Sequence, residues 1–107
     1  MIKRNEVPPE LLAAAENYLN ITWNDQATDD KVCGLIASGT AYLDLKGGGV
    51  LDYEADGMPR TLLLEYVRYG YSSALDVFET NYLNQLLAMR HERLVNEYAA
   101  ENAVSGE

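Results

Sequence analysis

Residues 59–97, with the sequence PRTLLLEYVRYGYSSALDVFETNYLNQLLAMRHERLVNE, carry the longest helical pattern in the chain. Apolar side chains recur there at three- and four-residue steps, the spacing that aligns side chains along one face of an α-helix. Pro59 opens the stretch, where proline is tolerated because its missing N–H would have no partner in a first helical turn. The pattern therefore predicts helix from about 59 to 97. Its apolar stripe comprises Leu63, Val67, Gly70, Ala74, Phe78, Tyr82, Leu86 and Met89, widened by Leu62, Tyr66, Leu75 and Leu87.

Two places in this stretch are candidates for a kink or a division into two helices. Gly70, Ser72 and Ser73 form a patch of weak helix formers, and Asn81 is the second candidate. Residues 98–107 have lost the apolar spacing, so we expect a flexible tail there.

Two shorter helical patterns precede the long one. Pro9 introduces a helix expected near residues 9–20, and a second helix is expected to begin at about residue 28 or 29, with Thr28 as its N-cap. Asp29 and Asp30 would then lie in the first turn, where the helix dipole favours negative charge. The run of three glycines at 47–49 is expected to end this helix. The apolar positions are Leu11, Leu12, Ala15, Tyr18 and Leu19 in the first helix and Val32, Leu35, Ile36, Gly39 and Leu43 in the second.

Gly34 and Gly39 lie inside the second predicted helix, where each costs about 1 kcal/mol relative to alanine. Close approach by another helix would explain them. Residues 46–58 combine glycines and carboxylates with few large apolar residues, and they predict a long flexible loop with a short extended piece at 50–53.

The 107 residues suit one domain with one core, and the apolar fraction of 48% excludes disorder as a description of the whole chain. We therefore expect an all-α fold: a small helical bundle over residues 1–107 with one long C-terminal helix, kinked or split. Residues 1–8, like the tail at 98–107, are expected to be flexible.

The formal charge of −9 argues against direct binding of nucleic acid, because a DNA-binding protein neutralises phosphates with clustered lysines and arginines. The closest basic pairs are Lys3 with Arg4 and Arg90 with Arg93. Cys33 is the only cysteine, so an internal disulfide and a multi-thiolate metal site are both impossible. The chain shows neither the roughly 20 apolar residues of a membrane helix nor a signal-peptide pattern, and we expect a soluble protein.

Each sequence pattern that resembles a metal, phosphate or catalytic site lacks a feature that the chemistry requires. Asp52, Glu54, Asp56 and Gly57 resemble the start of a calcium loop, but its twelfth position would be Leu63 in place of a bidentate glutamate. The glycines at 47–49 end a helix, whereas a phosphate-binding loop opens one. His91 and Cys33 have no partners that the sequence reveals. We expect no enzymatic activity, with no catalytic residue, metal ligand or cofactor.

The choice of aromatic residues is unusual, with eight tyrosines against one phenylalanine and one tryptophan. Tyrosine suits half-buried places and is enriched at protein interfaces. Tyr66, Tyr69 and Tyr71 point in different directions around one helix, so at least one of them is expected at the surface or in an interface. A monomer with tyrosines at the rim of its core explains the composition equally well.

The order of these segments resembles the head-to-tail connector, or adaptor, proteins of long-tailed bacteriophages and prophages. The resemblance covers residues 9–93, and its most specific parts are AYL followed by GGG at 41–49 and LLLEYVRYGYSSALDVFETNY at 62–82. It implies a structural protein of the virion, made in the host cytoplasm, that forms a ring under the portal, with twelve copies by family resemblance. Such a ring extends the DNA exit channel to the stopper or tail-completion protein, and an acidic wall lets DNA slide through without specific binding.

The resemblance also suggests where contacts between proteins lie. Ring contacts are expected on the long helix, and contacts with partners or with the channel are expected in the 46–58 loop and the 94–107 tail. Gly39 and Gly70 suit close helix packing between subunits. The expected subunit-interface residues are Tyr66, Arg68, Tyr69, Tyr71 and Tyr82, and the loop residues are Gly47, Gly48, Gly49, Asp52, Tyr53, Glu54 and Asp56. Arg68 would pair with a carboxylate of the neighbouring subunit or, equally, form an ordinary surface ion pair.

A second hypothesis comes from another functional class. An acidic helical protein of this size would also suit a regulator that binds a host protein or mimics DNA. A stable dimer that binds a transcription factor would favour the regulator, whereas ring-sized species or assembly on a portal would favour the connector.

Overall fold

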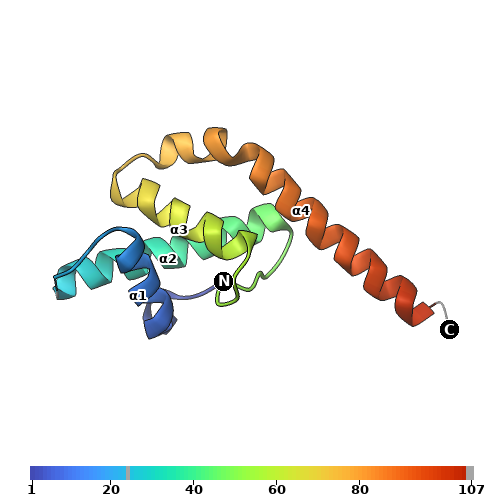
Figure 1. Ribbon diagram of the computed structural model, residues 1–107, viewed down its shortest axis with the longest axis horizontal. Coiled ribbons are helices and arrows are strands. Elements are labelled where there is room, and N and C mark those ends of the chain that lie inside the picture. The colour runs from blue at the N-terminus through green and yellow to red at the C-terminus, as the bar shows by residue number, and fades with distance from the viewer. Residues whose placement is uncertain (24, 106–107) are drawn as a thin grey trace.

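The computed structural model describes the backbone of residues 1–23 and 25–105 and the side chains through Ala99. Within this part of the chain the fold is all-helical, with four α-helices and no strand, so the predicted fold class is confirmed. A short 3₁₀ helix, η1, comes first, and the chain then passes through a bundle into one long helix (Figure 1). The elements are η1 (Arg4–Glu6), α1 (Pro9–Tyr18), α2 (Gln26–Gly47), α3 (Met58–Tyr71) and α4 (Leu75–Ser105).

The second helix begins earlier than predicted. Asp25 is the residue before α2, and the Thr28 hydroxyl donates a hydrogen bond to its carboxylate at 3.0 Å. Thr28 therefore lies inside the first turn, and its predicted role as N-cap is wrong. Gly48 ends the helix in a left-handed conformation, with φ of +85°, and the Gly49 N–H donates to the Asp44 carbonyl at 2.8 Å. The predicted glycine stop is confirmed, because glycine adopts this conformation without strain.

The long pattern divides into two helices at the first of the two candidate places. Ser73 has φ of +58°, and the Ala74 N–H donates to the Tyr69 carbonyl at 2.8 Å, which closes the end of α3. Asn81 lies inside α4, where its side chain donates to the Tyr69 hydroxyl at 2.9 Å. α4 continues to Ser105, so the prediction that helix ends near 97 is wrong. The alanines and glutamate of 99–103 favour helix even without an apolar stripe.

α2 lies at the centre of the bundle and contacts η1, α1, α3 and α4. Residues 1–8 run along it, and the Ile2 N–H donates to the Thr40 hydroxyl at 2.9 Å. The molecule measures 55 × 28 × 19 Å because the C-terminal part of α4 extends beyond the other helices (Figure 1). The buried apolar residues are Leu11, Ala15, Ile21, Val32, Ile36, Leu43, Tyr53, Leu62, Leu63, Tyr66, Val67, Phe78, Leu86 and Met89.

The glycines predicted to allow close packing act within the chain. A Cβ on Gly39 of α2 would lie 2.8 Å from both Leu63 Cδ1 and Tyr66 Cδ1 of α3, and a Cβ on Gly70 would lie 2.5 Å from Leu35 Cδ2. Both glycines therefore face another helix of the same chain, which corrects the expectation that they serve packing between subunits. The heavy atoms nearest to a Cβ on Gly34 belong to the Arg4 side chain, 3.7 Å away, so no tight approach by another helix explains this glycine among the described residues.

Gly39→Ala is expected to lower the free energy of unfolding by up to about 2 kcal/mol. The added methyl group overpacks the contact with the Tyr66 ring at a cost of about 1–3 kcal/mol, and better helix propensity returns about 1 kcal/mol. Gly34→Ala is the matched control and should stabilise by up to about 1 kcal/mol, because its methyl group has room. Urea unfolding followed by circular dichroism measures both. Equal effects of the two substitutions would contradict the assigned packing.

Candidate interaction surfaces

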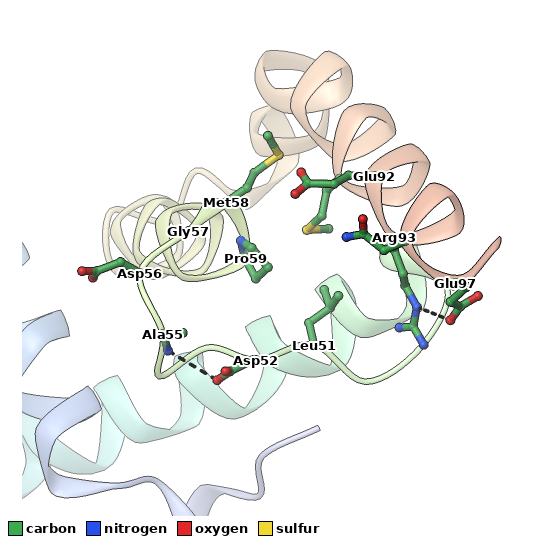
Figure 2. Close-up of a pocket in the computed structure, with 12 residues that line it drawn as sticks. Leu51, Asp52, Ala55, Asp56, Gly57, Met58, Pro59, Glu92, Arg93 and Glu97 are labelled. Atoms are coloured by element: carbon green, nitrogen blue, oxygen red, sulfur yellow. Dashed lines mark hydrogen bonds and ion pairs between the residues drawn. The ribbon is translucent and has the colours of Figure 1, made fainter. Parts of the chain in front are cut away.

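A groove of about 510 Å³ lies between the loop that joins α2 to α3 and the middle of α4 (Figure 2). Its apolar lining comes from both sides, with Leu51, Met58 and Pro59 from the loop and the start of α3, and Met89 from α4. Methionine side chains adapt their shape to a bound apolar group, so this lining suits the docking of side chains from another molecule. The polar lining residues are Asp52, Asp56, Glu92, Arg93, Asn96 and Glu97.

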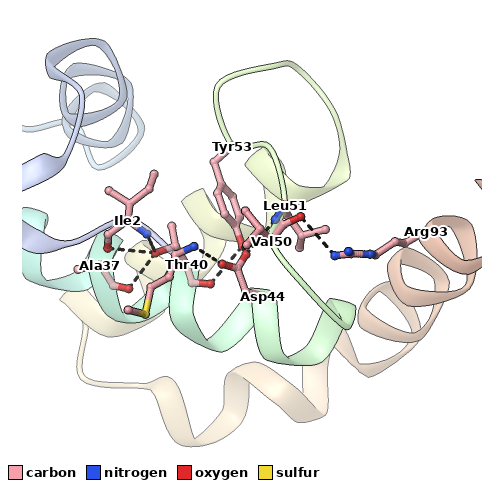
Figure 3. A network of polar contacts seen from close by, with 9 residues as sticks. Ile2, Ala37, Thr40, Asp44, Val50, Leu51, Tyr53 and Arg93 are labelled. Carbon is pink, nitrogen blue, oxygen red and sulfur yellow. Dashed lines mark hydrogen bonds and ion pairs between the residues drawn. The ribbon is translucent and has the colours of Figure 1, made fainter. Parts of the chain in front are cut away.

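The loop that forms one wall of the groove is held in place from two sides. On the α2 side, the Tyr53 hydroxyl donates to Asp44 Oδ1 at 2.6 Å, and the Leu51 N–H donates to the same oxygen at 3.1 Å (Figure 3). On the α4 side, Arg93 Nη1 donates to the Val50 carbonyl at 3.2 Å. The Arg93 guanidinium also covers Gly49, where a Cβ would overlap it. The expected mobile loop is therefore tied to both α2 and α4.

The structure divides the predicted loop residues into structural and exposed members. Gly47, Gly48 and Gly49 shape the end of α2, and Tyr53 is buried with its ring turned toward α2. The Asp52 carboxylate accepts the Glu54 N–H at 3.0 Å and so fixes the turn. Asp52 and Asp56 line the groove, and Glu54 is exposed beside it.

The tyrosines predicted at a subunit interface gather mainly inside the chain. Tyr66, Tyr69 and Tyr82 pack around Phe78 with ring centroids 5.0–5.6 Å from its own. Tyr66 is only 8% exposed, so it leaves little surface for another molecule to contact. Tyr69, Tyr71 and Tyr82 are half-buried, with Lys31 above the Tyr71 ring. Much of the tyrosine content is thus explained by the rim of the core.

Arg68 is exposed, but its partner is within the chain. Its guanidinium forms an ion pair with Glu65 at 2.6 Å, and Glu65 also accepts the Tyr18 hydroxyl. Burial would raise the pKa of Glu65, but the hydrogen bonds from Tyr18 and Arg68 outweigh it and hold the pKa below its ordinary value. The contact between α1 and α3 is thus the hydrogen bond from Tyr18 to Glu65, and Arg68 pairs with the same carboxylate from the next turn of α3. A contact of Arg68 with a neighbouring subunit would be additional to this ion pair.

Sequence reasoning missed a second apolar surface, on the outer side of α4. Leu83, Leu87, Leu94 and Tyr98 are 48%, 57%, 53% and 67% exposed. At 3.6 residues per turn these four positions fall within an arc of roughly 60°, so they form one stripe. We call it the outer stripe. Leu87 was predicted to widen the core stripe, and that assignment is wrong because the buried face of α4 is formed by Phe78, Leu86 and Met89. The sequence signal for the outer stripe was the spacing of its apolar residues, which follow one another at four, seven and four residues.

His91 and Cys33, the two residues considered for chemistry, have no catalytic partner among the described residues. His91 is exposed on α4. Burial raises the pKa of the Cys33 thiol, and the negative charges of Asp29 and Asp30 add to the effect, so the unreactive thiol predominates at neutral pH. Among the described residues no group of histidine, cysteine and carboxylate side chains is arranged to hold a metal ion.

No helix in the described part of the chain has the length and apolar character needed to cross a membrane. Comparisons of the chain with protein-family models, with characterised proteins and with solved structures find no match.

Proposed function

We propose that the protein is a head-to-tail connector of a long-tailed phage or prophage, a structural subunit that assembles as a ring under the portal. The observation that carries this proposal is the outer stripe of α4, which exposes large apolar side chains away from the core of the chain. A row of this kind marks a surface for other proteins, because a monomer gains nothing from exposing it. The second exposed feature that supports the proposal is the groove between α4 and the loop that joins α2 to α3.

The charge of the chain supports the same function. With 17 acidic against 8 basic side chains, a ring of these subunits presents a wall that repels phosphates. DNA that passes along such a wall gains no counterion release from binding, so it moves without being held. In this proposal the partners are further copies of the chain, the portal, and the stopper or tail-completion protein, and DNA is the passenger.

Assembly on the portal tests the proposal. The purified chain is mixed with the portal protein encoded by the same genome, and the particles are examined by electron microscopy and native mass spectrometry. We expect portal rings that gain a layer of density containing several copies of the chain. A chain that remains monomeric, both alone at high concentration and with the portal, would contradict the function. A stable dimer that binds a transcription factor would favour the regulator instead.

A further inference from the structure

The groove and the outer stripe have complementary chemistry. Three carboxylates of the groove, Asp52, Asp56 and Glu92, form no ion pair among the described residues, while Arg93 is already paired with Glu97 at 3.0 Å. The groove therefore combines an apolar floor with an excess of negative charge. A fitting occupant would present large apolar side chains with a positive charge between them.

The outer stripe has this composition. Arg90 lies one turn from both Leu87 and Leu94, is exposed, and makes no ion pair among the described residues. The segment Leu87 to Leu94 therefore places a free guanidinium between two exposed leucines. We propose that the outer stripe of one copy docks in the groove of the next copy, with Leu87 and Leu94 on the floor and Arg90 facing Asp56 and Glu92. This inference rests on the proposed function, for which it specifies the contact between neighbouring subunits.

The two surfaces lie on different faces of α4, so one copy presents both at once. Met89, Glu92 and Asn96 of α4 line the groove, and Figure 2 shows Glu92 at its α4 side. At about 100° per residue Leu87 and Leu94 lie on another face of α4, where both are exposed. A straight helix that borders a groove with one face does not insert its opposite face into that groove, so the chain does not fill its own site. The groove is left for a second molecule.

A contact between two different surfaces repeats from copy to copy. Such a head-to-tail contact forms a ring when the rotation between neighbours closes, and an open filament when it does not. A contact of the outer stripe with itself would instead stop at a two-fold dimer. The difference between the two arrangements gives a direct test.

Two double variants separate the surfaces. The stripe variant is Leu87→Asp with Arg90→Glu, and the groove variant is Asp56→Arg with Glu92→Arg. All four side chains are exposed or at the groove rim, so both variants should fold as the wild type does, which circular dichroism checks. The control for the stripe variant is Lys3→Glu with Ala13→Asp. The control for the groove variant is Glu6→Arg with Glu10→Arg. These controls make the same changes of charge at exposed positions of the N-terminal segment.

Association is measured by sedimentation velocity and native mass spectrometry near physiological salt, and by incorporation on the portal. We expect each double variant alone to associate at least about tenfold more weakly than the wild type, while the controls associate normally. An equimolar mixture of the two variants should form a dimer and nothing larger. The intact stripe of the groove variant docks in the intact groove of the stripe variant, and the other two surfaces of the pair are both damaged.

Three results would overturn the inference. Normal association of both variants would place the contact elsewhere and would leave the connector function intact. Loss of association in the stripe variant alone, with dimers of the groove variant, would indicate a two-fold contact between stripes. Binding of a small molecule or of a basic peptide from another protein in the groove, with unchanged self-association, would assign the groove to that ligand. Failure of the wild type itself to assemble or to add to the portal would instead reject the function.

Discussion

Replacing Phe78 with alanine is expected to lower the free energy of unfolding by about 3–5 kcal/mol. This loss is a large fraction of the total stability of a small domain, which is roughly 5–15 kcal/mol. Phe78 is 1% exposed and is surrounded by the rings of Tyr42, Tyr66, Tyr69 and Tyr82, with centroids 5.0–6.0 Å away. These four rings come from α2, α3 and α4, so their loss of contact with Phe78 loosens three helices at once. The cavity left by a phenyl ring adds to the lost transfer free energy.

Thermal and urea unfolding, followed by circular dichroism, measure this effect. Leu83→Ala is the matched control on the same helix, because Leu83 is 48% exposed and its truncation should change stability by less than about 1 kcal/mol. If Phe78→Ala cost no more than Leu83→Ala, α4 would not pack on α2 and α3 through this cluster.

Replacing Asp44 with alanine is expected to cost roughly 2–3 kcal/mol and to release the wall of the groove. The Asp44 side chain is 12% exposed, and its Oδ1 accepts hydrogen bonds from the Tyr53 hydroxyl and the Leu51 N–H. Removal of the carboxylate takes this acceptor from the Leu51 N–H and leaves the Tyr53 hydroxyl with the Thr40 carbonyl, 3.2 Å away. A buried donor that loses its partner costs about 1–3 kcal/mol. Faster hydrogen exchange at Leu51 and Tyr53 would report the loosened loop.

The control for this substitution is Tyr53→Phe, which keeps the ring and removes the hydroxyl with its hydrogen bonds to Asp44 and to the Thr40 carbonyl. It should cost about 1 kcal/mol and leave the Leu51 N–H protected. Unchanged exchange at Leu51 in Asp44→Ala would contradict the assignment of Asp44 as the anchor of the loop.

The same hydroxyl predicts a loss of stability in alkali. Burial raises the pKa of Tyr53 well above its ordinary value, and the hydrogen bond to Asp44 and the charge of Asp44 add to the effect. Because the pKa is higher in the folded than in the unfolded chain, the stabilising contribution is complete below about pH 10 and is lost as the pH rises further. Between about pH 10 and pH 12 the free energy of unfolding of Tyr53→Phe should fall less steeply with pH than that of the wild type. Tyr98→Phe, at a position 67% exposed, should lose stability with pH as the wild type does. Equal slopes for all three would contradict the buried position of Tyr53.

Substitutions that disturb the fold and substitutions at the proposed stripe contact can be separated in experiments. Phe78 and Asp44 act on the bundle and on the loop, so their substitution weakens assembly only by disturbing the fold. Leu87 and Arg90 are exposed on the outer side of α4, and in the proposed contact their substitution weakens association without disturbing the fold. A comparison of folding and assembly in the two sets of variants distinguishes a damaged subunit from a damaged interface.

The sequence by itself determined the helices and most of their ends. Apolar spacing of three and four residues defines amphipathic helices locally, and Pro9, Pro59 and the glycines at 47–49 act on backbone dihedrals within a few residues. The division of the long pattern near Gly70 to Ser73 is local for the same reason, since Ser73 takes a left-handed conformation that ends α3. These features need no knowledge of distant contacts.

Only the tertiary structure decided which apolar residues are buried and which surfaces remain. Leu86 and Leu87 are neighbours of the same type, yet one is 3% and the other 57% exposed, because the direction in which α4 leaves the bundle selects the buried face. The tyrosines are divided in the same way between the rim of the core and the surface. The groove is formed by Leu51 and Met89, which lie far apart along the chain, and no local pattern specifies that they meet. Burial depends on the packing of several helices at once, and spacing along one helix does not contain that information.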